Sequence, residues 1–499
     1  MPLNFKTNRK QFISQVAMLA AGLTVMPKSL LRAATPLDDR DFTMNECAII
    51  DMHCHPSMKM FLWGKKFWNA HWSVGKGDNL FPMQENERQF SFGNVRGIMA
   101  AHYLLEAATE REWHTLKALY PILKVIPFLG LNEKIEHEDP TNFDQVMKMI
   151  TILEGQMDEE NKRNTGITYK IAKNFAEYEA ALDDVSGKTI AIAHAIEGGH
   201  ALGRDLPISH ERQQKMAAAG AKRQRMFVPH LSPGDPWDPY ITNLLKFHEK
   251  GVCLMTLSHF FRNDLVYPVD GISPDAKKTP GMAWEYTPDQ DRELTVIGEK
   301  VVEKMLEIGM VVDLTHTAPM ARHQVFLLNR EVTKKRMDKG KNPRPVVFTH
   351  TGAQQIYEYY DQGHYPFYKA YCASDEEIAL IEECNGVIGV IAEDFWLTGA
   401  DANLKKEFRP AQFRDGISYI IQTMKYINSK TEKKRFDNIG IGTDFDGLAD
   451  NPKDLYKNKQ IKDLIDAMKR DPELNIEGED FISKITYKNA KRVLKDGWG

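Results

Sequence analysis

The chain has 499 residues, of which 42% are hydrophobic and 27% charged, which is the composition of a globular protein with a large core. Its formal net charge is −4 with both signs mixed along the chain, so no nucleic-acid partner is expected. Five cysteines without a CxxC motif do not predict a disulfide framework.

The N-terminal segment differs from the rest of the chain. Basic residues precede an apolar run from Phe12 to Met26, and small residues suited to cleavage follow at 30–35. This order is typical of an export signal. "NRKQFIS" (8–14) resembles the twin-arginine signal, with Lys10 in place of the second arginine. We therefore predict that residues 1–34 direct export, in a bacterium to the periplasm, as a cleaved signal or as an anchor. The alternative is an amphipathic N-terminal helix.

Short apolar segments that each end in a polar residue recur along the remaining chain and are predicted as β-strands. They are 48–55, 97–103, 189–199, 252–259, 310–316, 345–351, 386–396 and 438–447, with 124–131 as a ninth candidate. Amphipathic helical patterns lie between them. In 294–308 the apolar residues form one buried helix face and Gly309 ends the helix, and similar patterns run through 413–427 and 461–468.

This alternation predicts the fold class. Continuously apolar strands that alternate with helices favour a parallel sheet, and eight such units favour an α/β (β/α)₈ TIM barrel. Residues 35–499 are therefore predicted to form a single barrel domain, in which 56–95, 200–240 and 352–375 are long loops. In such barrels the functional residues lie at the carboxyl ends of the strands, where this chain carries its polar side chains.

The first strand ends in an unusual group, His53-Cys54-His55. Because side chains alternate along a strand, the two histidines face one way and Cys54 faces the other. Two imidazoles on one face at the open end of a barrel strand form half of a metal site. An HxH sequence alone is weak evidence in a chain with 16 histidines.

Three later strand ends strengthen this interpretation. Glu197 ends the third strand in "IEGGH", His316 ends the fifth, and His350 ends the sixth. The alternative is that the two histidines are hydrogen-bonded core residues. Taken together, four histidines and one carboxylate at the same end of a barrel suit two borderline cations such as Zn²⁺. The predicted metal ligands are His53, His55, Glu197, His316 and His350.

Two further strand ends carry candidate catalytic groups. Asp444 follows the eighth strand in "TDFDG", where a carboxylate near a metal-bound water can take a proton and return it to the leaving amine. His259 follows the fourth strand and can stabilise a developing oxyanion. The alternative for His259 is a supporting hydrogen bond. Asp446 is interpreted as a strand-end cap, and His102, His194 and His200 as structural residues.

With these residues in place, the chain resembles the renal or membrane dipeptidase family, the M19 metallopeptidases of the amidohydrolase superfamily. The similarity extends from about Ala48 to Val493 and rests on "AIEGGH", "LTVIGEKVVEKMLEIGMVVDLTH", "VVFTHT" and "NIGIGTDFDG" in that order. The resemblance implies a barrel with two zinc ions whose bridging hydroxide attacks the amide bond of a dipeptide or another small amide.

The resemblance also implies individual roles. His53 and the residue two positions on would bind one zinc, and Glu197 would bridge both ions and so belong to the catalytic set. The second zinc would be held by the following pair, His316 and His350. Of the remaining two, His259 would contact the substrate and the tetrahedral intermediate, and Asp444 would handle the proton and the substrate's amino group.

Two departures from the family pattern bear on metal and substrate. The first motif is usually His-x-Asp, whereas this chain has His55 at the third position, which leaves the site about one charge unit more positive. The family arginine that grips the substrate carboxylate has no counterpart in 351–377, where Lys369 is the cation. That stretch is instead rich in aromatics, which pack the loop or line a less polar pocket. They are Tyr357, Tyr359, Tyr360, Tyr365, Phe367, Tyr368 and Tyr371.

These observations predict an exported zinc-dependent dipeptidase-like hydrolase. A metal-dependent amidohydrolase acting on a lactone or an N-acyl substrate, and a catalytically inactive exported binding barrel, are the alternatives. The expected partner is a dipeptide or another small molecule. After removal of the signal we expect no integral membrane span, and a homodimer is one option for assembly.

Overall fold

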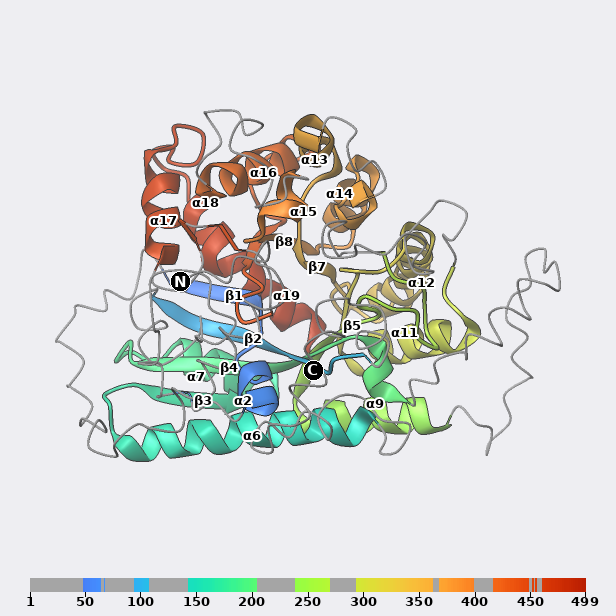
Figure 1. Ribbon diagram of the computed structural model, residues 1–499. Helices are drawn as coiled ribbons and strands as arrows, with labels where there is room; N and C mark the ends of the chain where they lie inside the picture. Colours follow the sequence, from blue (N-terminus) through green and yellow to red (C-terminus); the bar gives the residue numbers. More distant parts are fainter. Residues whose placement is uncertain are drawn as a thin grey trace, which may run out of the picture.

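The computed structural model describes residues 48–63, 67, 94–106, 142–203, 238–269, 293–361, 368–398, 416–447, 451–452, 454–455 and 460–499 (Figure 1). The predicted export signal at 1–34 and the ninth strand candidate at 124–131 lie outside these ranges. None of the helices in the described ranges has the length and apolar character needed to cross a membrane.

The centre of the fold is a closed parallel barrel, as predicted. Nine parallel strands follow the order β2-β1-β9-β8-β7-β6-β5-β4-β3, and an additional pairing of β2 with β4 closes an eight-stranded ring that leaves β3 outside it. The strands are β1 Ile49–Cys54, β2 Val95–Tyr103, β3 Thr168–Ala172, β4 Thr189–Glu197, β5 Val252–Thr256, β6 Val311–Asp313, β7 Val346–Thr351, β8 Val387–Ile391 and β9 Ile439–Gly442.

Strand β3 was not predicted. It pairs with the first half of β4, from Thr189 to Ala193, and β5 takes over the same edge of β4 from His194 onward. Thr168 and Lys170 of β3 are exposed, whereas Tyr169 and Ala172 are buried. A strand with one exposed face lacks the continuous apolar run by which the barrel strands were recognised.

Helices surround the barrel, and their bounds follow the predicted patterns where the amphipathic signal is strong (Figure 1). Helix α11 begins after the N-cap Thr295 and ends at Gly309, which has φ 87° and the left-handed conformation that favours glycine. The helices are α2 Met58–Trp63, α6 Asn142–Arg163, α7 Phe175–Leu182, α9 Asp238–Lys250, α11 Val296–Ile308, α12 Pro319–Met337, α13 Gln354–Asp361, α14 Asp375–Glu383, α15 Asp394–Thr398, α16 Gly416–Lys430, α17 Ile461–Arg470, α18 Phe481–Ser483 and α19 Asn489–Gly497, with shorter turns at η3 Gly199–Leu202, η5 Tyr368–Tyr371 and η9 Lys484–Lys488.

The predicted loop at 352–375 is instead partly helical, because it contains α13 and η5. The helix α13 buries Tyr357 at its centre, and the ring of Tyr357 meets that of Phe395 in α15 at 6.4 Å. Several strands also end earlier than predicted. The strand β8 ends at Ile391, and α15 begins at Asp394 within the segment predicted as strand.

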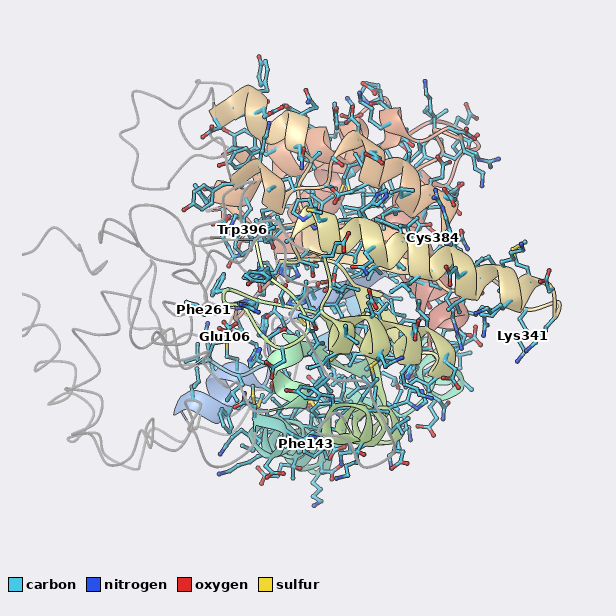
Figure 2. The ribbon with its side chains drawn as sticks, turned by 90° about the vertical axis from the view of Figure 1, so that its right-hand side faces the viewer. Glu106, Phe143, Phe261, Lys341, Cys384 and Trp396 are labelled. Atoms are coloured by element: carbon cyan, nitrogen blue, oxygen red, sulfur yellow. The ribbon has the colours of Figure 1, made fainter. Side chains whose placement is uncertain are left out.

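The two ends of the barrel are filled differently. On β4, Ala191, Ala193 and Ala195 share a strand face with Glu197 and pack in one apolar cluster with Leu494 of α19. Gly499, two residues after α19, donates a backbone hydrogen bond to the carbonyl oxygen of Gly309, which lies just before β6. Helix α19 therefore covers the amino ends of the strands. The carboxyl ends are left for polar side chains. Figure 2 shows Glu106, Phe261 and Trp396 at this end and Lys341 at the opposite side of the molecule.

Candidate functional site

The strand ends converge on the carboxylate of Glu197, the last residue of β4. Its Oε1 lies 3.3 Å from Nε2 of His53, 3.3 Å from Nε2 of His316 and 3.5 Å from Nε2 of His350. Its Oε2 lies 3.3 Å from Nε2 of His55. All five side chains are at most 2% exposed, so the cluster is shielded from water. The structure therefore brings the five predicted metal ligands to one point.

The two predicted catalytic residues lie beside this cluster. Asp444 Oδ1 is 3.1 Å from His55 Nε2, and His259 Nε2 is 3.7 Å from Glu197 Oε2. Among the described residues, three groups have potential ligand atoms within 4.8 Å of one another. They are His53 with His350 and Asp444, His53 with His55 and Glu197, and Glu197 with His259 and His316.

Local backbone irregularities aim these side chains. The pairing register shifts between Asp51 and Cys54 on β1 and between Phe348 and Thr351 on β7, at the histidine-bearing end of each strand. Such shifts redirect side chains relative to simple alternation. Two site residues that follow strands have left-handed backbone, with φ 64° at His316 and 55° at Asp444. This conformation is uncommon outside glycine and occurs often at functional sites.

The turn that carries Asp444 needs a glycine. Asp444 itself has φ 55°, and its backbone N–H donates to His53 O at 2.9 Å. A Cβ atom on Gly447 would stand 2.0 Å from Asp444 Oδ1 and 2.8 Å from His55 Cδ2. A side chain at position 447 would therefore displace the carboxylate from the cluster.

A buried carboxylate below the cluster ties three strands together. Asp313, the last residue of β6, accepts hydrogen bonds from Thr256 Oγ1, from N and Oγ1 of Thr315, and from N and Oγ1 of Thr349. These donors occupy both carboxylate oxygens, so Asp313 acts as an acceptor in all five hydrogen bonds. It therefore must take the single hydroxyl proton of Thr349.

The consequence falls on two of the histidines. Thr349 Oγ1 donates to Asp313 at 2.6 Å and lies 3.1 Å from His53 Nδ1 and 2.9 Å from His350 Nδ1. Because the only hydroxyl proton of Thr349 is donated to Asp313, Thr349 Oγ1 can only accept from the two imidazoles. Both Nδ1 atoms must therefore carry a proton and donate it to this oxygen. This assignment from the hydrogen-bond network leaves the Nε2 atoms of both rings facing Glu197, as metal-binding histidines require.

Replacing Thr349 with valine should weaken metal binding. Valine has a similar shape but cannot accept from either imidazole, so both rings lose the contact that sets their tautomer. We expect metal affinity to fall about 10- to 100-fold, the usual effect of removing such a supporting contact. Competition with a coloured chelator measures it, with Thr349→Ser as the matched control that keeps the hydroxyl. Equal affinity of the valine variant and the wild type would contradict the assigned tautomers.

The charge state of the cluster also fits a cation. Burial would raise the pKa of Glu197, but the imidazoles of His259, His53 and His55 hold it well below its usual range. Burial would lower the pKa of His53, but the Glu197 carboxylate raises it to about 9. Burial lowers the pKa of His350 and keeps that ring neutral. The Glu197 carboxylate thus stays ionised among imidazole nitrogens, and such a set of oxygen and nitrogen donors suits zinc.

Aromatic rings border one side of the cluster. Tyr371 stacks on Trp396 at 4.1 Å, and both rings lie within 5.6 Å of the His316 ring. Phe260 stands 5.6 Å from the same imidazole. The aromatic residues of the 351–377 stretch were expected either to pack the loop or to line a pocket. Tyr357 and Tyr368 pack against Phe395, and Tyr359 is 66% exposed. Tyr360 meets Tyr419, and Tyr365 and Phe367 lie outside the described residues.

Other polar residues considered in the sequence lie outside the cluster. His102 Nε2 is 2.9 Å from His194 Nδ1, and His102 Nδ1 is 2.8 Å from Ser57 Oγ. His200 Nε2 is 2.9 Å from Leu104 O. Asp446 forms a buried ion pair with Lys59 at 2.5 Å. These contacts agree with structural roles for the three histidines, whereas Asp446 pairs with a lysine in addition to following a strand.

Several residues in and around the site were not singled out from the sequence. Asp51 accepts from His53 N and from both N and Oγ1 of Thr443, which joins β1 to the end of β9, and burial raises its pKa to about 6. An aspartate shortly before a strand-end histidine occurs twice, in "IIDMHCH" and "VVDLTH", and this repetition was an available signal for Asp51 and Asp313. No comparable signal marks Glu106, which lies 3.3 Å from His259.

Solved structures share this fold. A metallo peptidase from Rhodobacter sphaeroides, liganded with a phosphinate mimic of the dipeptide L-Ala-D-Ala, matches 91% of this chain and 100% of its own, with a TM-score of 0.56 and 16% identity. The probable dipeptidase PvdM from Pseudomonas aeruginosa matches 91% of this chain and 96% of its own, with a TM-score of 0.55 and 14% identity. At these identities the likeness concerns the fold.

Sequence relatives include two fungal dipeptidases. Dipeptidase aclJ of Aspergillus oryzae is 23% identical over 253 residues, which cover 51% of this chain and 47% of that protein. Dipeptidase tcpJ of Claviceps purpurea is 24% identical over 250 residues, which cover 50% and 46%. The chain thus spans about half the length of these curated relatives.

The family assignment rests on a longer match. The family model described as membrane dipeptidase, peptidase family M19, matches residues 208–497, more than half of the chain. This span includes His259, His316, His350 and Asp444, while Glu197 and the HxH strand precede it and meet those residues in the barrel. This match covers more than half of the chain, and a solved structure of the same family has the same fold. The chain therefore belongs to the membrane dipeptidase family.

Proposed function

We propose that this protein is a zinc-dependent hydrolase that cleaves the amide bond of a dipeptide or a similarly small substrate. One observation carries the proposal. Both oxygens of a single buried carboxylate, Glu197, face imidazole nitrogens from several strands, with the Asp444 carboxylate alongside. A carboxylate that has imidazole nitrogens next to each of its two oxygens is suited to bind one metal ion through each oxygen. The names of the fungal relatives and of the structural neighbours support the same reaction class.

Each residue has a role that its position allows. His53, His55, His316 and His350 would hold the metal together with Glu197. Zinc bound there would polarise the scissile carbonyl and increase the acidity of a coordinated water. Asp444, next to His55, is placed to take a proton and to return it to the leaving amine. His259 is placed to stabilise negative charge on the carbonyl oxygen.

The surroundings favour a substrate whose C-terminal carboxylate is masked. The 351–377 stretch has no arginine, and its Lys369 forms an ion pair with Glu358 at the surface. Arg262 lies over the ring of Tyr267 at 4.2 Å. Beside His316 the structure instead presents the rings of Tyr371 and Trp396. An apolar border next to the metal ligands suits an uncharged group better than a carboxylate.

We therefore expect weak hydrolysis of Gly-Leu and faster hydrolysis of the same dipeptide as its amide or methyl ester. The loss of a charge-assisted contact to the free carboxylate costs about 1.5–3 kcal/mol, which is about 10- to 150-fold at roughly 1.4 kcal/mol per decade. A comparison of kcat/KM for the free and masked forms on the zinc-loaded protein measures this difference.

The function itself is tested by extending this comparison to a panel that also contains lactones and N-acyl amino acids. Hydrolysis of one of these compounds instead of the dipeptides would support the alternative reaction. Binding without hydrolysis of any member would indicate an inactive binding barrel. A clear preference for the free dipeptide would contradict the masked-substrate proposal. Lys369→Met and Arg262→Met would then show which cation grips the carboxylate.

Export is a separate proposal that rests on the basic and apolar pattern of residues 1–34. Fractionation of the native host followed by N-terminal sequencing tests it. We expect a mature N-terminus near Ala33–Pro36 if the signal is cleaved. Intact Met1 on protein recovered from the cytoplasm would contradict export.

A further inference from the structure

Glu106 is a buried carboxylate at the catalytic end of the barrel with no role so far. It follows β2, is 1% exposed, and lies against the loop that follows β5. Its Oε1 accepts from Phe261 N at 3.0 Å, and its Oε2 accepts from Phe260 N at 3.3 Å and from Tyr103 Oη at 3.1 Å. Figure 2 shows Glu106 and Phe261 close together at this end. Burial raises the pKa of Glu106, and these three donors oppose that shift.

A fourth contact links Glu106 to the candidate catalytic histidine. Glu106 Oε2 lies 3.3 Å from His259 Nδ1, and Nε2 of the same ring is directed at Glu197 Oε2, 3.7 Å away. The ring is confined by Tyr103 at 3.9 Å and Phe260 at 3.8 Å. Because a carboxylate with donors on both oxygens acts as an acceptor, His259 Nδ1 donates to Glu106 Oε2 and Nε2 is directed to the cluster. Nε2 stabilises negative charge when it also carries a proton, and a carboxylate at Nδ1 favours this imidazolium form.

We propose that Glu106 is a positioning residue that holds the His259 ring with Nε2 directed at the reacting centre. The proposal rests on the proposed amide hydrolysis, in which negative charge develops on the carbonyl oxygen. A ring turned by half a rotation would present carbon atoms to that oxygen and lose the stabilisation. Carboxylates that orient a functional histidine through its second nitrogen act in this way in other enzymes.

A purely structural role makes a different prediction. Glu106 also binds the backbone of Phe260 and Phe261, so it could serve only to hold this loop. In that case its replacement would lower stability and change substrate binding whether or not His259 is present. A positioning role acts through the imidazole alone. The two roles therefore separate when the effect of Glu106 is measured with and without His259.

The experiment uses the zinc-loaded full chain and the variants Glu106→Gln, His259→Ala and their combination. We expect Glu106→Gln to keep its metal and to lower kcat about 10- to 100-fold with a smaller change in KM. The affinity for a phosphinate dipeptide analogue, measured by calorimetry, should fall by the same factor as kcat/KM, because the tetrahedral phosphinate mimics the transition state. In the His259→Ala background the glutamine should cause no further loss.

Glu160→Gln is the matched control, because Glu160 is a fully buried carboxylate in α6 paired with Arg163, and we expect wild-type kcat from it. If Glu106→Gln does not fold, Glu106→Asp keeps the charge, shortens the reach to Nδ1 and should show the same losses. Unchanged kcat/KM in a folded variant, or an equal loss without His259, would overturn the proposal while leaving the proposed function intact. Absence of hydrolysis by the wild type would overturn both.

Discussion

Glu197→Gln should lose most of the bound metal and with it nearly all turnover. The substitution keeps the size of the side chain but removes the charge that faces imidazoles on both of its oxygens. A carboxylate that bridges two ions contributes to holding each, so both should be lost together. Elemental analysis after zinc loading and removal of excess metal measures this, and we expect close to two ions per chain in the wild type and well below one in the variant.

The control for this experiment is again Glu160→Gln, which removes a buried carboxylate remote from the cluster. It should hold as much zinc as the wild type. Retention of both ions by Glu197→Gln would show that the imidazoles suffice. A wild type that binds no metal after loading would contradict the metal site as a whole.

Asp444→Asn should keep its metal and lose at least about 100-fold in kcat, the usual range for the loss of a general acid–base group. Asparagine has the same size and can stay beside His55, but it cannot take up a proton at neutral pH. Asp444 lies at the edge of the cluster, where its Oδ1 meets His55 Nε2 at 3.1 Å. Steady-state kinetics with parallel metal analysis separates loss of chemistry from loss of zinc.

Asp437→Asn provides a matched comparison, because Asp437 lies just before β9 at the opposite end of the same strand and pairs with Lys484. Its kcat should equal that of the wild type. Normal turnover by Asp444→Asn would assign that residue a structural role. Loss of zinc from this variant would instead make Asp444 a metal ligand, as its grouping with His53 and His350 allows.

Much of the fold followed from local patterns. The ring of eight strands was predictable because barrel strands buried on both faces leave continuous apolar runs. Helix α11 was predictable because its apolar face and Gly309 are local signals. The strand β3 escaped because one of its faces is exposed, and α13 escaped because its aromatic residues were interpreted as a loop. Pairing with β4 stabilises β3, whereas α13 carries an amphipathic pattern that was available in the sequence.

The sequence by itself determined which residue types stand at the carboxyl ends of the strands, and parallel topology then requires those ends to lie on one face. Only the tertiary structure decided which side chains meet. Asp313, Thr349 and the rings of His53 and His350 join three strands into one hydrogen-bond network. Glu106 and His259 meet although 153 positions separate them. Such contacts depend on strand register, on its shifts near the histidines and on left-handed backbone at Asp444, none of which the periodicity of a single segment encodes.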